Sequence, residues 1–143
     1  MKTFKTKTET FNHIKRKFSR YGRTILVRGS TAYGEVKSFS DFDVEVYGGK
    51  LNKPYYEIDF LNHKPVLISV YFYRYSSGKK LKPEKNVRVL YGEYNENLKP
   101  DFSREKYSLE QKIRRECQMV VDSLFSYLRH RDKKDLGRVQ KRI

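Results

Sequence analysis

Two aspartates, Asp41 and Asp43, stand one residue apart in the segment Phe39–Tyr47, where acidic and apolar side chains alternate. Strict alternation predicts a strand that gathers Asp41, Asp43 and Glu45 on one face. Two carboxylates that point the same way can share divalent metal ions, Mg²⁺ or Mn²⁺, which bridge phosphate oxygens and align an in-line attack. Alternating acids also occur on solvated strands, so the pair needs support from its surroundings.

A candidate phosphate-binding loop precedes this strand. The segment Arg23–Arg28 is rich in β-branched and apolar residues and predicts a strand that ends at Gly29 and Ser30. A glycine lets the backbone approach a phosphate, and the serine hydroxyl and free amides can cradle it. We expect a turn region at Gly29–Gly34; a short helix that opens there would direct the positive potential of its N-terminus at the phosphate. Neither the loop nor the acids alone would be sufficient for this chemistry, which needs both a bound phosphate and bound metal ions.

These residues resemble the signature of the nucleotidyltransferase superfamily of DNA polymerase beta, which is a strand, Gly-Ser, a variable gap and then acid, hydrophobic, acid. The matching segments are Gly29–Gly34 and Ser40–Val44. The resemblance implies that Gly29 permits the approach of a triphosphate, that Ser30 contacts its oxygens, and that Asp41 and Asp43 hold two Mg²⁺ or Mn²⁺ ions. It also implies the reaction, in which a nucleoside monophosphate passes from a triphosphate to a hydroxyl of a protein, an RNA or a small molecule.

The chain departs from this pattern at the third carboxylate that such enzymes usually carry on a later strand. In layout the hairpin 55–73 resembles that of aminoglycoside nucleotidyltransferases, which implies a third acid within residues 68–70, where this chain has Ser69. A serine is a poor Mg²⁺ ligand and a poor general base near neutral pH. If the hairpin turns about His63, Glu57 lies across from Ser69 on the same open face as Asp59. The candidates for the missing role are Glu57, Asp59 and Glu45. Each of these acids can equally be a solvated strand residue, and the activity can have weakened or been lost.

Helices and strands must position these residues. Apolar spacing in Thr8–Tyr21 predicts an amphipathic helix that ends at Gly22, and a capping box of Ser108 and Gln111 starts a long one. An apolar stripe follows this long helix: Leu109, Ile113, Cys117, Val120, Leu124 and Leu128. Strands are predicted at Arg23–Arg28, Phe39–Tyr47, Tyr55–Leu61, Val66–Tyr75 and Val87–Tyr91.

The expected fold class is α/β (α+β), with a mixed, mostly antiparallel sheet of the nucleotidyltransferase type. We expect the helices to pack on one face of that sheet, and the long C-terminal helix to pack on the sheet or on a partner. Residues 1–131 should form a single nucleotidyltransferase-like domain. Residues 132–143 should form a basic tail that frays or binds something anionic.

The composition of the chain indicates which kinds of partner it can have. Lysine and arginine number 32 against 17 acidic residues in 143, and the net charge of +15 favours RNA or DNA as partners beside the nucleoside triphosphate. No apolar run approaches the roughly 20 residues of a membrane span, and the start lacks a signal-peptide pattern. We therefore expect a cytoplasmic protein that does not associate with a membrane. The single cysteine, Cys117, excludes an internal disulfide. Few Cys and Met beside many Lys, Arg and Glu are typical of a thermophile.

Two functions remain open at this stage. The small size resembles minimal nucleotidyltransferases of toxin–antitoxin pairs, which implies a helical protein partner that receives the nucleotide. The apolar stripe can instead join two copies in a homodimer. The alternative function is a nucleic-acid-binding or interaction module that keeps the fold while Ser69 marks weakened or lost catalysis.

Overall fold

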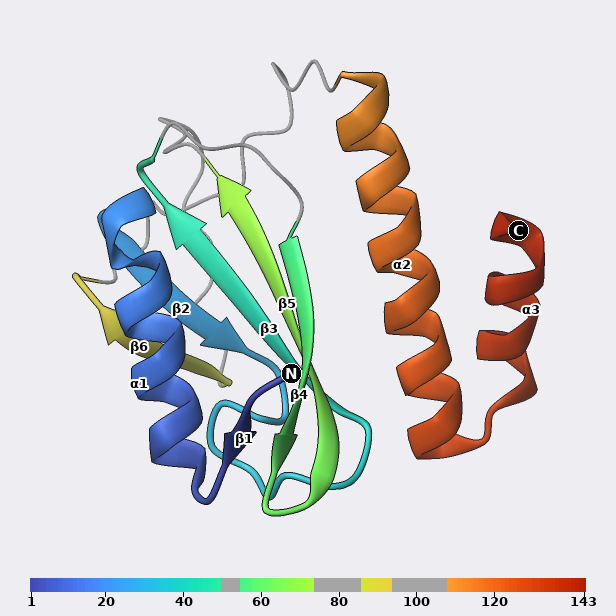
Figure 1. Ribbon diagram of the computed structural model, residues 1–143, viewed down its shortest axis with the longest axis horizontal. Coiled ribbons are helices and arrows are strands. Elements are labelled where there is room, and N and C mark those ends of the chain that lie inside the picture. The colour runs from blue at the N-terminus through green and yellow to red at the C-terminus, as the bar shows by residue number, and fades with distance from the viewer. Residues whose placement is uncertain (50–54, 74–85, 94–107) are drawn as a thin grey trace.

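The computed structural model describes residues 1–49, 55–73, 86–93 and 108–143. A curled sheet of six strands, in the order β1-β4-β5-β3-β2-β6, lies between helix α1 on one face and helix α2 on the other (Figure 1). The elements are β1 (Thr3–Phe4), α1 (Lys7–Phe18), the 3-10 turn η1 (Ser19–Tyr21), β2 (Thr24–Arg28), β3 (Ser40–Tyr47), β4 (Tyr55–Leu61), β5 (Lys64–Tyr73), β6 (Val87–Tyr91), α2 (Leu109–His130) and α3 (Lys133–Arg142).

Strand pairing confirms a mixed, mostly antiparallel sheet in an α+β fold. The pairs β2–β3, β2–β6 and β4–β5 are antiparallel, whereas β1–β4 and β3–β5 are parallel. The predicted strands all form, and the last two residues predicted for β5, 74 and 75, lie outside the described residues. Within the part of the chain that is described, no helix is both long and apolar enough to cross a bilayer.

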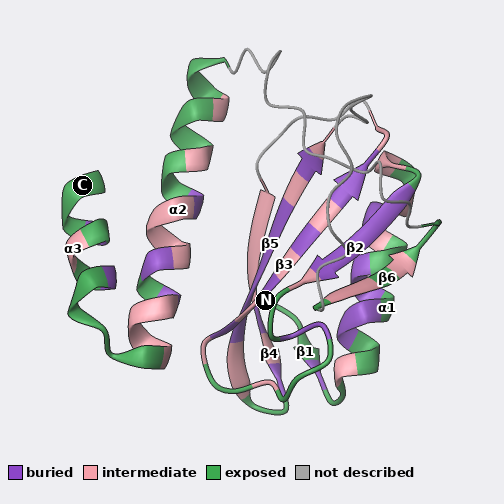
Figure 2. Cartoon of the chain, turned by 180° about the vertical axis from the view of Figure 1, so that it is seen from behind, coloured by how far each residue is buried: buried purple, intermediate pink, exposed green. Residues whose placement is uncertain are grey.

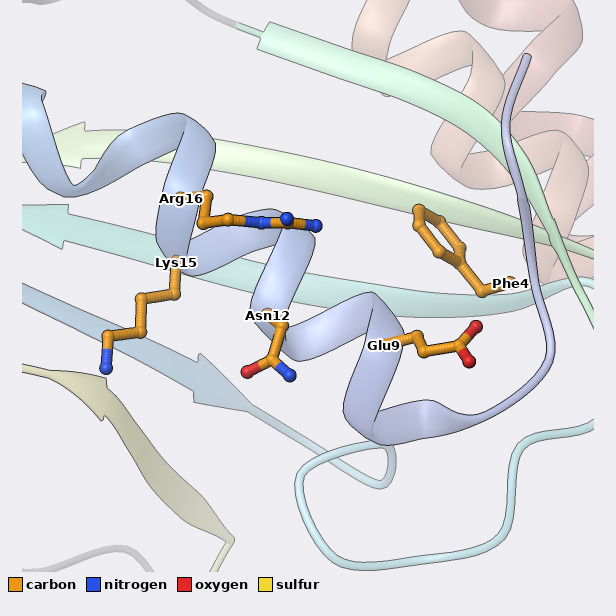
Figure 3. Close-up of a pocket in the computed structure, with 5 residues that line it drawn as sticks. All are labelled: Phe4, Glu9, Asn12, Lys15 and Arg16. Atoms are coloured by element: carbon orange, nitrogen blue, oxygen red, sulfur yellow. The ribbon is translucent and has the colours of Figure 1, made fainter.

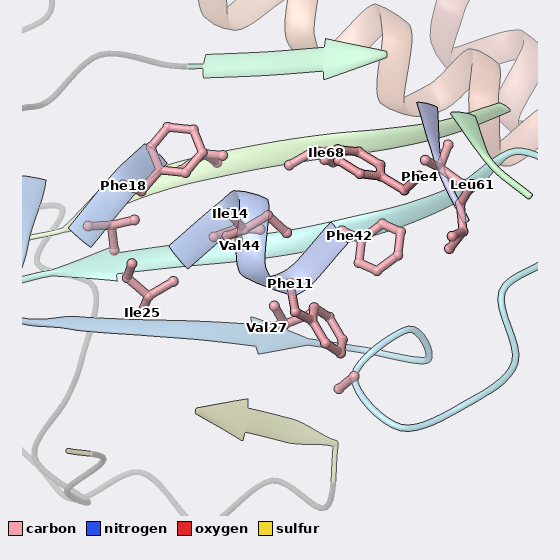
Figure 4. Packing of buried hydrophobic residues seen from close by; sticks show 14 of the residues in the cluster. Phe4, Phe11, Ile14, Phe18, Ile25, Val27, Phe42, Val44, Leu61 and Ile68 are labelled. Carbon is pink, nitrogen blue, oxygen red and sulfur yellow. The ribbon is translucent and has the colours of Figure 1, made fainter. Parts of the chain in front are cut away.

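Helix α1 and the sheet build the main hydrophobic core. The side chain of Thr6 caps α1 by accepting from the amide of Glu9, and the apolar spacing of Phe11, Ile14 and Phe18 turns these side chains toward the strands. All three are at most 5% exposed. They pack against the α1-facing side chains of the central strands (Figure 4). Each such side chain contributes roughly 1.5–3 kcal/mol of burial free energy, which fixes α1 on this face.

The alternation predicted for β3 is confirmed. Phe42, Val44 and Val46 are buried toward α1, while Asp41 and Asp43 stay partly accessible on the opposite face. Figure 2 shows the same alternation as buried and intermediate bands along β3. Successive side chains of a strand point to opposite faces of the sheet. Because the apolar side chains of β3 pack against α1, the acidic side chains point to the opposite face.

The prediction that the helices share one face is wrong, because α2 lies on the acidic face of the sheet. Its contacts there come largely from polar side chains: Gln118 Nε2 donates to the Tyr55 carbonyl at 3.2 Å, and Ser69 Oγ donates to Asp122. The predicted apolar stripe does not make this contact, since Leu109 is 74% and Ile113 55% exposed. A helix that covers carboxylates needs hydrogen-bonding groups on its inner side, which explains this orientation.

The residues expected to form a basic tail include a further helix, α3. Arg131 has a left-handed backbone with φ 57°, Asp132 caps the next turn, and α3 runs back beside α2. Asp135 and Val139 are buried in the contact, where Ser126 Oγ of α2 donates to Asp135 at 2.7 Å. The cap and these two buried side chains stabilise α3.

Candidate active site

The Gly29–Ser30 loop lies directly beside the acidic strand. Arg28 pairs with Asp43 in the β2–β3 register, and a Cβ on Gly29 would lie 3.8 Å from Asp43 Oδ2. Ser30 is exposed at this end of β2. The structure therefore brings together the predicted phosphate loop and the predicted metal ligands.

Residues 29–34 form turns, which confirms the expected turn region, and the short helix considered there does not form. Gly29 has φ +82°, a left-handed conformation that starts a turn rather than a helix. The Ala32 amide donates to the Gly29 carbonyl at 3.2 Å, and the Gly34 amide donates to the Ser30 carbonyl at 2.8 Å. A phosphate at this loop would therefore meet the Ser30 hydroxyl and local amides without a helix macrodipole behind them.

Asp43 is the most strongly perturbed carboxyl of the described site. Burial, followed by the negative charges of Asp41, Asp122 and Glu45, raises the pKa of Asp43 to about 7, and the Arg129 guanidinium opposes this shift. Carboxylates that share a desolvated site raise one another's pKa. A divalent cation would relieve this repulsion, which is what the donor chemistry of a Mg²⁺ or Mn²⁺ site requires.

Asp122 reaches the site from α2, and the sequence analysis missed it. Ser69 lies across from Asp43 in the β3–β5 register and is fully buried. Its hydroxyl donates to Asp122 Oδ1 at 2.6 Å, and the Tyr71 hydroxyl donates to Asp122 Oδ2 at 3.2 Å. Burial and the charge of Asp41 raise the pKa of Asp122, although the two hydroxyl hydrogen bonds oppose the shift. A carboxylate is thus present where the strand itself offers only a serine.

A signal for Asp122 was present in the sequence. The residues of α2 that contact the sheet and the loop before β3 recur at helical spacing: Gln118, Asp122, Phe125 and Arg129. This stripe is mostly polar and lies beside the apolar one, so hydrophobic periodicity alone gave no reason to place it on the sheet.

Glu45, a candidate for the third acid, is occupied by other partners. Arg28 Nε lies 2.7 Å from Glu45 Oε2, and the Tyr47 hydroxyl donates to the same oxygen at 2.7 Å. Both partners lie on the same face of the sheet as Glu45. The carboxylate is therefore engaged in an ion pair beside the candidate site.

Glu57 and Asp59 lie on the opposite face from Ser69, so the expectation that they share its open face is wrong. The hairpin turns through Asn62 and His63, which both have a positive φ, and pairs Leu61 with Lys64. That turn places Tyr56, not Glu57, across from Ser69. A register shift of one residue moves every side chain of a strand to the other face.

Glu57 instead ties β4 to α1. It accepts from His13 Nε2 and Lys17 Nζ, each at 2.7 Å, and from the Tyr55 hydroxyl at 2.8 Å. These hydrogen bonds, above all that from Lys17, lower the pKa of Glu57 against the opposing effect of burial. Asp59 is 2% exposed, and its Oδ1 accepts from the Lys2 amide at 2.6 Å. The ligand atoms of His13, Glu57 and Asp59 lie within 4.8 Å of one another, so this group could also hold a metal.

The described residues line a cavity beside the candidate site and another along α1. One of about 480 Å³ adjoins the Gly29–Ser30 loop and receives three cationic or ionisable nitrogen side chains; its lining is Ser30, Gly34, Glu35, Lys37, Ser40, Arg129 and His130. The other, of about 500 Å³, lies along α1 and β1 away from the acids (Figure 3). Its lining is Phe4, Glu9, Asn12, Lys15 and Arg16. The first cavity is the one that combines the loop with positive charge.

Comparison of the chain with protein-family models gave no match. Comparison with curated proteins gave no match either.

Proposed function

We propose that the protein is a Mg²⁺- or Mn²⁺-dependent nucleotidyltransferase, which moves a nucleoside monophosphate from a triphosphate to a hydroxyl acceptor. The single observation behind this proposal is the position of Asp43 beside the Gly29–Ser30 loop, with Asp41 on the same face of β3. Phosphoryl transfer needs little covalent chemistry from the protein, and depends on holding the phosphates and neutralising their charge. Residues at the end of β2 and the start of β3 support both requirements.

The divalent ions, when bound, would neutralise the triphosphate and activate the acceptor hydroxyl. Asp41 and Asp43 would hold them, and the raised pKa of Asp43 marks a site where added positive charge is favourable. Ser30 would donate to a phosphate oxygen, and Gly29 leaves room for that approach because it has no side chain. Lys37 and Arg129 line the adjoining cavity and would attract the remaining phosphate charge.

The acceptor belongs to the same proposal. A net charge of +15 favours an anionic acceptor such as RNA, and a helical protein partner or a small molecule is the alternative. A homodimer through the apolar side of α2 would bring two sites into one assembly. We place the activity in the cytoplasm, where triphosphates and Mg²⁺ are available.

The test is transfer of label from each of four nucleoside triphosphates, with Mg²⁺ or Mn²⁺, to RNA, DNA or protein. We expect one nucleotide to label one acceptor class, and the Asp41→Asn/Asp43→Asn double variant to lose the transfer. Glu110→Gln is the matched control, because Glu110 is an exposed acid paired with Arg114 in the first turn of α2. It should keep wild-type activity.

Binding measurements decide the opposite outcome. The proposal fails if no acceptor is labelled and if triphosphate binding is identical in the wild type and the double variant. If both proteins then bind RNA without metal, with affinity that falls steeply as salt rises, the fold acts as a nucleic-acid-binding module instead.

A further inference from the structure

We propose that Asp122 of α2 supplies the third carboxylate ligand of the divalent cation site that Asp41 and Asp43 begin. In this proposal Ser69 and Tyr71 are positioning residues that orient Asp122. The inference rests on the proposed function, since it names a further ligand of that same site.

Asp122 lies close to Asp43 across Ser69. Parallel pairing sets Ser69 directly beside Asp43, and the hydroxyl of Ser69 reaches Asp122 Oδ1 at 2.6 Å. One hydrogen bond therefore separates Asp122 from the strand position next to Asp43. The negative charges of Asp41 and Asp122 both raise the pKa of Asp43, and the charge of Asp41 also raises the pKa of Asp122. The three carboxyl groups therefore lie close enough to repel one another.

Two hydroxyl groups hold the carboxylate of Asp122. Its two oxygens accept from the hydroxyls of Ser69 and Tyr71, which are neutral donors. Such donors fix the direction of a carboxylate and leave its negative charge uncompensated, and each oxygen keeps lone-pair capacity for a cation. Among the described residues, no lysine or arginine forms an ion pair with Asp122, whereas Glu45, Glu57 and Asp135 each have one.

Helix α2 is docked by contacts on both sides of Asp122. Gln118 bonds the Tyr55 carbonyl above Asp122, and below it Phe125 packs edge-on against Phe39 with ring centroids 5.7 Å apart. Contacts on both sides hold the helix at a fixed height over the strands, so the position of Asp122 does not depend on its own side chain alone. The arrangement also accounts for Ser69, because an acid there would face Asp122 and repel it.

The decisive variant is Asp122→Asn, which removes the charge but keeps an oxygen that can accept from Ser69. The readout is Mn²⁺ affinity, measured from the electron paramagnetic resonance signal of free Mn²⁺, beside label transfer and thermal unfolding. We expect the affinity to fall about 10- to 100-fold, as for the loss of a coordinating or supporting group. Unfolding of the metal-free protein should not move to lower temperature, since a repulsive charge is gone. Glu110→Gln should leave the Mn²⁺ affinity unchanged.

The positioning role has its own variants. Ser69→Ala and Tyr71→Phe each remove one hydroxyl, and we expect each to lower Mn²⁺ affinity by about tenfold. Ser69→Thr retains the hydroxyl and should restore the affinity, which a purely structural role of the serine would not predict. These variants decide the question if Asp122→Asn does not fold.

The possible results separate the two proposals. Asp122 is not a ligand if Asp122→Asn binds Mn²⁺ as the wild type does while Asp41→Asn/Asp43→Asn loses it, and the nucleotidyltransferase proposal then stands on two carboxylates. If the double variant also keeps Mn²⁺ affinity and label transfer, the proposed function and the role of Asp122 both fail.

Discussion

Arg129 Nη1 donates to Asp41 Oδ1 at 2.7 Å, so the last turn of α2 is joined to the first acid of β3. The same guanidinium donates to the Phe39 carbonyl at 3.3 Å and lines the cavity beside Ser30. Arg129 thus stands between a candidate metal ligand and the space where a triphosphate would lie.

Replacing Arg129 should separate metal binding from triphosphate binding. In Arg129→Gln we expect triphosphate affinity to fall about tenfold, because a charge-assisted hydrogen bond contributes roughly 1.5–3 kcal/mol. Mn²⁺ affinity should stay the same or rise, because the cation that competes for Asp41 is gone. Titration with a fluorescent triphosphate and with Mn²⁺ alone measures the two. A drop in Mn²⁺ affinity would show that Arg129 holds the site together rather than competing for it.

The pKa of Asp43 predicts how the stability of the metal-free protein depends on pH. Folded Asp43 keeps its proton up to about pH 7, whereas in the unfolded chain it ionises near its ordinary value of about 3.9. Between these values the folded state binds more protons, so the free energy of unfolding falls as pH rises, by at most about 1.4 kcal/mol per unit. Urea unfolding at several pH values between 4.5 and 7.5 measures this slope.

Asp43→Asn is the matched variant for the pH measurement. It should remove much of the slope and be more stable than the wild type near pH 7. The lowered pKa of Glu57 acts in the opposite direction, and its contribution is lost only as pH falls below the usual range of a glutamate. An unchanged slope in Asp43→Asn would place the responsible proton on another group.

Glu57 should matter for stability and not for metal binding at the acidic face. Glu57→Gln removes the charge that His13 and Lys17 share, and we expect a loss of about 1–3 kcal/mol in the free energy of unfolding. Label transfer and Mn²⁺ affinity should remain those of the wild type. If Mn²⁺ affinity falls in Glu57→Gln but not in Asp43→Asn, the cation binds to His13, Glu57 and Asp59 instead.

Gly29 should resist substitution because of its backbone. A Cβ at this position meets only ordinary van der Waals contact with Asp43 Oδ2, so the cost of Gly29→Ala comes from the φ of +82°. We expect about 1–2 kcal/mol of destabilisation, and less for Gly29→Asn, since asparagine tolerates this conformation better. Thermal unfolding compares the two. Equal losses in both variants would point to crowding rather than backbone strain.

The acidic face was predictable because its signal is local. The alternation in Phe39–Tyr47 fits a half-buried strand only if its apolar side chains face the core. It therefore predicted correctly that Asp41 and Asp43 share the opposite face. The hairpin was predicted as an element but its register was not, because two left-handed residues at Asn62 and His63 shift the pairing by one. That single shift moved Glu57 and Asp59 to the other face.

Asp122 was not predictable from local pattern, since its position depends on which side of α2 meets the sheet. Hydrophobic periodicity favoured the side with Leu109 and Ile113, whereas hydrogen bonds from Ser69 and Tyr71 select the polar side. Such a choice is made by tertiary contacts, which override the pattern of one helix.

The order of the elements along the chain also determines when the site can be completed during synthesis. All six strands are present once the ribosome has passed Tyr91, while Asp122 and Arg129 are added later. Because N-terminal segments emerge and fold first, a nascent chain can expose Asp41 and Asp43 before the helix that covers them exists. The cation site proposed above would therefore be complete only after α2 has been made.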